Sequence, residues 1–142
     1  MQDGLTISEA SQTLGMTPHT LRYYERAGLL PAVARTDGGL RRYQDEDVQL
    51  LRFLARLRLT GMPIRQVRKY SELVRQGNFT MAARREMLEK HRKEMESRIA
   101  QLQRNLEILD LKINLYETGW VHGDSPSNAC AEKLRCLLEE KG

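Results

Sequence analysis

The sequence is poor in several features on which other kinds of protein depend. It has no apolar run that approaches the length of a membrane span, and its N-terminus lacks the pattern of a signal peptide, so we expect a cytoplasmic protein without a membrane role. Its two cysteines, Cys130 and Cys136, are too few for a disulfide framework. Aromatic residues make up only 6% of the chain and charged residues 30%, which favours helices with small cores over a β-sandwich.

Catalytic groups are also scarce. The three histidines, His19, His91 and His122, fall in different predicted elements, and none has an evident nucleophile or carboxylate partner. The pair Gly38-Gly39 belongs to neither the P-loop nor the dinucleotide-binding fingerprint. We therefore expect neither enzyme activity nor a cofactor.

The positive charge of the chain is concentrated in its first half. Residues 1–76 hold twelve basic and eight acidic side chains, whereas residues 77–142 hold eleven of each, so the net charge of +4 lies in the first half. Eleven of those twelve basic residues are arginine. Because the planar guanidinium binds phosphate and guanine through two hydrogen bonds, this asymmetry supports a contact with DNA.

Two short helices are predicted at the start of this basic half. Thr6 and Glu9 form a capping box, and apolar residues at helical spacing then continue to Gly15. Thr17 is a candidate N-cap for a second helix, which Gly28 ends. Two helices separated by a tight turn form a helix-turn-helix, in which the second helix enters the major groove of DNA.

The second of these helices carries side chains suited to phosphates and base edges. Leu21 is expected to face a core, and polar residues around it are expected to face solvent. An ordinary polar surface helix would show the same pattern, but the helix upstream favours the DNA-reading interpretation. The candidate contacts are His19, Thr20, Arg22 and Tyr23.

A β-hairpin is predicted next, because the turn signal Asp37-Gly38-Gly39 separates two short segments. Arginines lie on both segments, and a hairpin of this kind is suited to binding a phosphate backbone. Its candidate contacts are Arg35, Arg41, Arg42 and Tyr43.

Two further helices are predicted at residues 45–59 and 64–76, and Asp45 or Asp47 is the expected cap of the first. The arginines that flank the break between them form either a second contact with the DNA backbone or a solvated face. These arginines are Arg58, Arg65 and Arg68. The residues expected to face inward are Val48, Leu51, Leu54, Leu57, Ile64, Val67, Tyr70 and Leu73.

A long heptad pattern without proline or glycine runs from Thr80 to about Tyr116. As one helix it would span about 55 Å. A single helix cannot bury its own seam, so the pattern predicts a partner, most simply a second copy of the chain. The seam consists of Met81, Leu88, Met95, Leu102, Leu109 and Tyr116, with Arg92, Ile99, Leu106 and Ile113 four residues after the middle members.

A second apolar face near the end of this helix is formed by Ile108, Leu111 and Leu115. It predicts a contact beyond the coiled-coil partner, either with a DNA-binding domain or with the tail. The tail is expected to be a polar linker over residues 118–128 and a weak helix over residues 129–140.

Five motifs in this order resemble those of the MerR family of bacterial transcription regulators. They are Leu21-Arg22-Tyr23-Tyr24-Glu25, Gly28-Leu29, Arg41-Arg42-Tyr43, Asp47-Val48 and Gly61-Met62. The resemblance covers roughly residues 5–117 and implies a mainly α protein. Its parts would be a winged helix-turn-helix DNA-binding domain at 1–77, a long antiparallel coiled-coil dimerisation helix at 78–117 and a tail at 118–142 where an effector could act.

The resemblance decides two points that the residues leave open. Charges beside the seam slightly favour a parallel pair of helices, but exposed pairs contribute only about 0.2–1 kcal/mol each, so the antiparallel pairing of the family is preferred. The resemblance also places the residues of the second helix at the major groove or its phosphates and those of the hairpin in the wing contacts. The helix residues are Thr17, His19, Thr20, Arg22 and Tyr23, and the hairpin residues are Arg35, Arg41, Arg42 and Tyr43. The resemblance leaves Tyr24 partly in the core.

The resemblance further implies a mechanism. Dimers of this family bind a palindromic site between two promoter elements that lie too far apart for RNA polymerase. An effector changes the dimer so that it bends and untwists the DNA, which realigns the two elements. Simple repression is the alternative for individual members.

The effector stays open. Metal-sensing relatives place a cysteine near the start of the dimer helix, where residues 76–79 hold none here. Cys130 and Cys136 would lie about 120° apart on a helix, so they could chelate one ion, with or without His122, only in a non-helical segment. No tight cysteine cluster exists for iron and sulfur. The chain looks most like a short-tailed branch whose members respond to aldehydes or other electrophiles, but it lacks their cysteine in the helix at 45–59.

Two other functions compete with this one. A DNA-architectural or excisionase-like accessory protein can use a similar winged domain, although the long dimer helix argues against it. A coiled-coil adaptor without a DNA role is the third interpretation, and DNA binding that weakens with salt would exclude it.

Overall fold

The computed structural model describes residues 4–30, 33–118 and 129–140 of the chain. It contains two compact units, Met1–His91 and Arg92–Gly142. Among the described helices, none is both long and apolar enough to cross a membrane.

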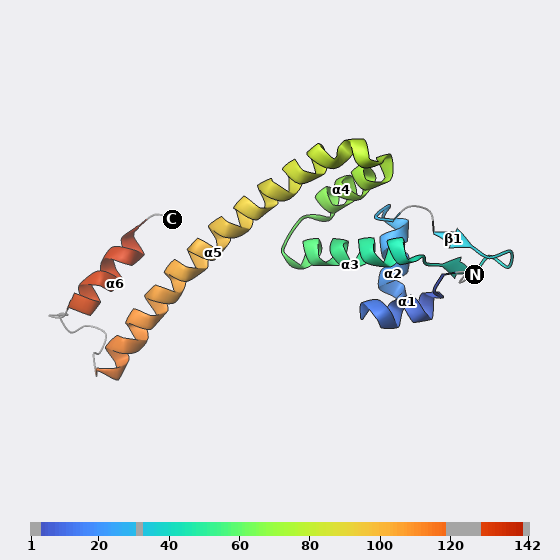
Figure 1. Ribbon diagram of the computed structural model, residues 1–142. Helices are drawn as coiled ribbons and strands as arrows, with labels where there is room; N and C mark the ends of the chain where they lie inside the picture. Colours follow the sequence, from blue (N-terminus) through green and yellow to red (C-terminus); the bar gives the residue numbers. More distant parts are fainter. Residues whose placement is uncertain (1–3, 31–32, 119–128, 141–142) are drawn as a thin grey trace. The chain divides into compact units, whose positions relative to one another are not determined.

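The helix-turn-helix is formed by α1 (Ile7–Leu14) and α2 (Pro18–Arg26), as predicted (Figure 1). The capping box of α1 is present, and the Thr6 backbone N–H donates to the Glu9 carboxylate at 2.8 Å. This hydrogen bond is the main cause that lowers the pKa of Glu9 below its usual value. Gly15 ends α1 at a φ of 66°, a value that glycine adopts without strain.

The predicted hairpin consists of β1 (Ala34–Arg35) and β2 (Arg41–Arg42), paired antiparallel with Arg35 opposite Arg41. The turn between them is closed by the Thr36 backbone N–H donating to the Leu40 carbonyl at 2.8 Å. An isolated bridge joins Tyr43, just after β2, to Leu5 near the start of the chain. The hairpin is therefore attached to the helix-turn-helix at its base.

Helices α3 (Asp45–Leu59) and α4 (Ile64–Gln76) match the predicted ranges. The predicted cap of α3 was wrong, because Gln44 occupies the N-cap and both aspartates lie inside the first turn. Asp47 still contributes, since its carboxylate accepts from the Gln44 backbone N–H at 2.9 Å. The acidic first turn also suits the positive end of the helix dipole.

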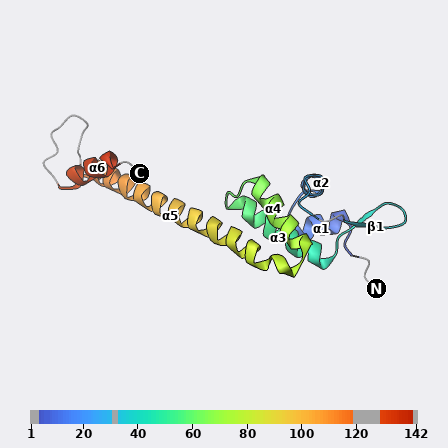
Figure 2. The ribbon, with the colours of Figure 1, turned by 90° about the horizontal axis from the view of Figure 1, so that it is seen from above.

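The core of the N-terminal unit has two clusters, and the elements around them lie together in both views (Figures 1 and 2). Tyr24 packs partly against both clusters, as expected. Most of the predicted inward residues of α3 and α4 are buried, whereas Ile64 and Leu73 are partly exposed. The buried members of the two clusters are Ala10, Leu21, Leu30, Val33, Tyr43, Val48 and Leu51, and Leu29, Leu54, Leu57, Met62, Val67 and Tyr70.

The N-terminal unit extends past residue 77 because the first turns of α5 (Met81–Glu117) pack on its second cluster through Met87 and Leu88. A short 3₁₀ turn, η1 (Asn78–Thr80), precedes α5, and the Thr80 hydroxyl donates to the Leu73 carbonyl at 2.5 Å. His91 is buried, with Nε2 2.7 Å from the Thr60 hydroxyl. Leu88, predicted for the seam, is thus partly covered by its own chain.

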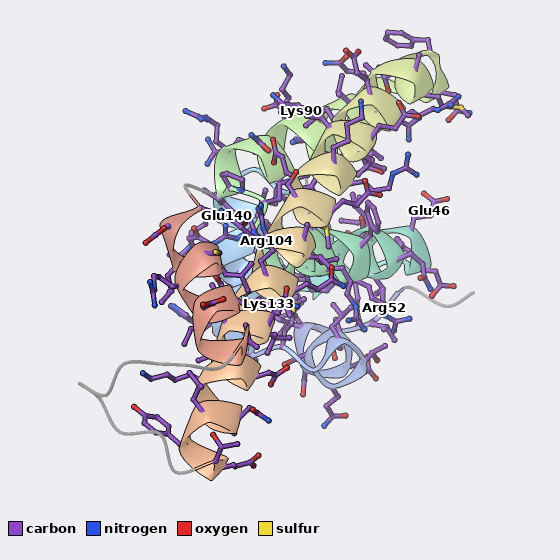
Figure 3. All side chains as sticks on the ribbon, turned by 90° about the vertical axis from the view of Figure 1, so that its left-hand side faces the viewer. Glu46, Arg52, Lys90, Arg104, Lys133 and Glu140 are labelled. Carbon is purple, nitrogen blue, oxygen red and sulfur yellow. The ribbon has the colours of Figure 1, made fainter. Side chains whose placement is uncertain are left out.

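The C-terminal unit contains the rest of α5 and the helix α6 (Ala129–Glu139). Leu134 on α6 is buried against Leu115, with Ile108 and Leu111 beside them, so the second apolar face of α5 contacts the tail, one of the two predicted partners. Lys133 lies 3.0 Å from Glu107 across the same contact. Figure 3 shows Lys133 on α6, and Glu140 just after α6, beside Arg104 on α5. Of the predicted linker at 118–128, residues 119–128 lie outside the described residues.

Two leucine variants test the first core cluster. Leu51 is fully buried and Leu40 is 66% exposed at the hairpin turn. We expect Leu51→Ala to lower the free energy of unfolding by about 2–5 kcal/mol, because it removes buried methyl groups and leaves a cavity. Leu40→Ala should change it by no more than about 0.5 kcal/mol. Urea unfolding followed by circular dichroism measures both, and equal losses would contradict the packing described here.

Candidate nucleic-acid interface

Helix α2 presents one polar face to solvent. Leu21 is fully buried beneath it, and the side chains on the opposite side are exposed, including Tyr23 at 48%. Arg26 belongs to this face too, although the sequence analysis did not select it. Its spacing of four residues from Arg22 was the available signal, since residues four apart share a helix face. The exposed face consists of His19, Arg22, Tyr23 and Arg26.

The two threonines at the start of α2 form its cap. The Thr17 hydroxyl accepts from the Thr20 backbone N–H at 3.1 Å and lies 2.9 Å from the Thr20 hydroxyl. Thr17 is exposed, whereas Thr20 is partly buried. Both were predicted to contact DNA, and the structure gives them a structural role at the N-terminus of the helix, where exposed N–H groups and the helix dipole also attract phosphate.

The three arginines of the hairpin differ in their exposure and in their hydrogen-bond partners. The Arg35 guanidinium donates to the Gly39 carbonyl at 3.0 Å across the turn, and it is half-exposed. Arg41 is hydrogen-bonded through Nε to the carboxylate of Glu25 on α2. Arg42 on β2 is partly buried, and its Nε is buried without a hydrogen-bond partner among the described residues. Arginine side chains from both strands therefore lie next to the recognition helix α2.

Tyr43 was predicted to contact the phosphate backbone, and the structure assigns it to the core instead. Its side chain is fully buried with Leu21, Val48 and Leu51. Burial raises the pKa of its hydroxyl above the ordinary value. The hairpin itself was predicted correctly. Tyr43 follows the two-residue strand β2, and its side chain packs in the core between the hairpin and the helices.

Helix α4 holds the C-terminal end of α2 in place. The Ser71 hydroxyl, fully buried, donates to the Leu29 carbonyl, and Arg75 donates to the Gly28 carbonyl at 2.6 Å. These bonds satisfy carbonyl groups of the two residues that follow the C-cap of α2, and they tie that segment to α4. Sequence reasoning missed both residues. The available signal was a serine one turn after Val67, on the inward face of a helix.

The break between α3 and α4 is also basic. Arg58 closes it by donating to the Met62 carbonyl at 2.9 Å, while Arg65 and Arg68 are exposed. Arg58 therefore has a structural partner, and the other two remain candidates for contacts with the DNA backbone.

The described residues contain no cluster of candidate metal ligands. Within residues 4–30, 33–118 and 129–140, no group of three histidine, cysteine, aspartate or glutamate side chains is placed to hold a metal ion. Cys136 is a free, exposed thiol. His122 and the side chain of Cys130 lie outside the described part.

Two helices joined by a tight turn, an exposed polar face on the second helix and an adjacent arginine-bearing hairpin define a winged helix-turn-helix DNA-binding protein. A family model described as "MerR HTH family regulatory protein" matches residues 5–74, and one described as "MerR, DNA binding" matches residues 48–111. The chain belongs to the MerR family and is a DNA-binding transcriptional regulator.

Individual relatives agree with this assignment. A Haemophilus influenzae protein described as an uncharacterized HTH-type transcriptional regulator is 35% identical, over 79% of this chain and 83% of that protein. A Listeria monocytogenes structure described as a MerR family regulator is 40% identical with a TM-score of 0.75, covering 81% of this chain and 87% of that one. HiNmlR, a MerR family regulator crystallised with promoter DNA, is 34% identical with a TM-score of 0.70, covering 80% and 90%.

The corrected role of Tyr43 can be tested by deleting its hydroxyl. We expect Tyr43→Phe to leave DNA affinity unchanged and to raise the free energy of unfolding by about 1–3 kcal/mol, because the buried hydroxyl has no hydrogen-bond partner among the described residues. Fluorescence anisotropy with a bound duplex and urea unfolding measure the two quantities. A loss of affinity at unchanged stability would return Tyr43 to the DNA interface.

Proposed function

We propose that this protein binds a palindromic promoter site as a homodimer and controls transcription by distorting the DNA between two promoter elements. An effector changes the dimer, and RNA polymerase then engages both elements. The observation that carries the proposal is an exposed apolar row along α5, which follows a basic winged helix-turn-helix domain in the sequence.

The apolar row is the predicted heptad seam. Six of its side chains are between 51% and 59% exposed, a large value for residues of this kind. Burying a leucine or isoleucine contributes about 1.5–3 kcal/mol, so pairing two such rows would offset the cost of ordering two chains. These exposed residues are Ile99, Leu102, Leu106, Leu109, Ile113 and Tyr116. Met95 is partly exposed and completes the seam, with the partly covered Leu88 at its end.

The tail does not compete for the seam. On a helix with 100° per residue, the face that contacts Leu134 lies about 160° around α5 from the centre of the seam. A second copy of the chain can therefore pack on one side of α5 while α6 stays on the other. The tail is then available as the region where an effector acts.

A two-fold dimer implies a palindromic site. Two copies of α2 related by a two-fold axis read the same sequence on opposite strands, so the operator repeats the symmetry of the protein. The promoter DNA in the HiNmlR crystal structure supports a promoter as the target of this chain as well. The separation of the half-sites depends on the antiparallel pairing of α5, which the family resemblance favours.

Selection of bound genomic fragments by the purified dimer tests the function. Footprinting the selected fragments should show a palindrome that fills an over-long spacer between promoter elements, and permanganate or bend assays should show distortion there. A footprint in an attachment site would support the accessory-protein interpretation instead. Binding that does not weaken with rising salt would argue against phosphate contacts altogether.

Recognition by α2 can be tested with two arginine variants. We expect Arg22→Ala to weaken binding to a selected fragment by about tenfold to a hundredfold, because one arginine contact with a base contributes about 1–3 kcal/mol. Arg85→Ala removes the same charge from α5, where the guanidinium pairs with Glu89, and serves as the control. Equal effects of the two variants in gel-shift titrations would show that α2 binds through net charge and not through Arg22.

The seam can be tested with two glutamate variants. We expect Leu102→Glu to convert the dimer to a monomer, because two glutamates would be buried opposite apolar side chains. Ala100→Glu adds the same charge on an exposed position outside the seam and should stay dimeric. Multi-angle light scattering measures both masses. If Leu102→Glu remains a dimer, the heptad assignment is wrong.

A further inference from the structure

Glu25 is the acidic residue that joins the recognition helix to the wing. We propose that Glu25 is a positioning residue that holds the wing arginines in a fixed place beside α2 and thereby sets the sequence selectivity of DNA binding. This inference rests on the proposed function and adds to it, because neither the family match nor the sequence motifs gives Glu25 a role.

The carboxylate of Glu25 contacts both strands of the hairpin. One oxygen accepts from the Arg41 Nε on β2, and the other lies 3.5 Å from an Arg35 guanidinium nitrogen on β1. The Glu25 side chain is only 17% exposed and that of Arg41 25%. Since water screens buried pairs less than exposed ones, these contacts constrain the side chains more than an ordinary surface pair does.

The hairpin needs such an anchor. Each strand has two residues, and a two-stranded hairpin of this size is marginally stable alone. Tyr43 and the bridge to Leu5 fix its base, but they lie outside the turn. The Arg35 guanidinium also donates to the Gly39 carbonyl at 3.0 Å, so Glu25 reaches the turn through Arg35. One carboxylate on α2 thus contacts both strands of the wing directly and reaches its turn through Arg35.

The charge of Glu25 acts in a second way. A carboxylate close to a phosphate-binding surface repels DNA, so Glu25 lowers the non-specific affinity that the two arginines would otherwise provide. Specific binding depends instead on where the guanidinium groups lie relative to α2. Glu25 therefore lowers one affinity and supports the other, and the ratio between them is the quantity that it controls.

The test measures that ratio for the unaltered protein and three variants. The probes are a duplex selected from a random pool by the unaltered protein and a duplex of unselected random sequence. We expect Glu25→Gln to tighten binding to the random duplex and to lower the ratio of the two affinities by about tenfold. The slope of log affinity against log salt should steepen by about one phosphate, because one negative charge is lost.

Glu25→Asp separates position from charge. Aspartate keeps the charge but is one carbon shorter, so it cannot contact both arginines from the same backbone position. We expect the affinity ratio to fall, but by less than for Glu25→Gln because the repulsion of the random duplex is kept, while the salt slope stays unchanged. Glu72→Gln, on the exposed face of α4, is the matched charge control and should keep the ratio of the unaltered protein. Circular dichroism and thermal melting establish that every variant is folded.

Three outcomes would overturn the inference. If Glu25→Gln changes both affinities by the same factor, Glu25 has a merely structural role. If Glu25→Asp behaves like the unaltered protein, charge alone accounts for the effect and positioning is wrong. If the unaltered protein selects no sequence from the pool, the proposed function fails and this inference fails with it, a result that is distinct from the first two.

Discussion

The placement of α2 on the rest of the N-terminal unit is the constraint on which the DNA-binding surface depends. A nine-residue helix is too short to be stable in water alone, so its conformation is imposed by packing. Leu21 anchors its middle in the core, Thr17 caps its start, and Ser71 and Arg75 of α4 bind carbonyls of the segment that follows it. Because these contacts lie on one side, the opposite side is left for DNA.

The long helix α5 completes the core of the N-terminal unit with its first turns, and its later turns present two separate apolar faces. Its first turns complete the core of the N-terminal unit through Met87 and Leu88, and its later turns carry an apolar seam on one face and the tail contact on another. Heptad spacing keeps the seam on one side of the helix, whereas Ile108, Leu111 and Leu115 are spaced to form a face of their own. One helix can therefore support a coiled coil and hold the tail without conflict.

Local patterns in the sequence predicted most of the helices and the hairpin, because caps, glycines and apolar spacing act within a few residues. The capping box of α1, the cap of α2 and the turn at residues 37–39 are of this kind. The residues whose roles were misassigned or missed depend on contacts distant in sequence. Tyr43 looked like an exposed hairpin residue until the helices packed on it, and Ser71 and Glu25 have partners 42 and 16 residues away, respectively.

Contacts within the folded chain also determine which of its arginines are available to DNA. The surplus of arginine in residues 1–76 indicated a DNA contact, but a count treats every guanidinium as equally available. In the folded unit, Arg41 and Arg35 are held by Glu25, Arg58 by the Met62 carbonyl and Arg75 by the Gly28 carbonyl. A guanidinium fixed by one partner keeps N–H groups for a phosphate or a base, and it offers them in one direction. The partners of the arginines therefore determine in which direction their remaining N–H groups point, which a count of charges does not show.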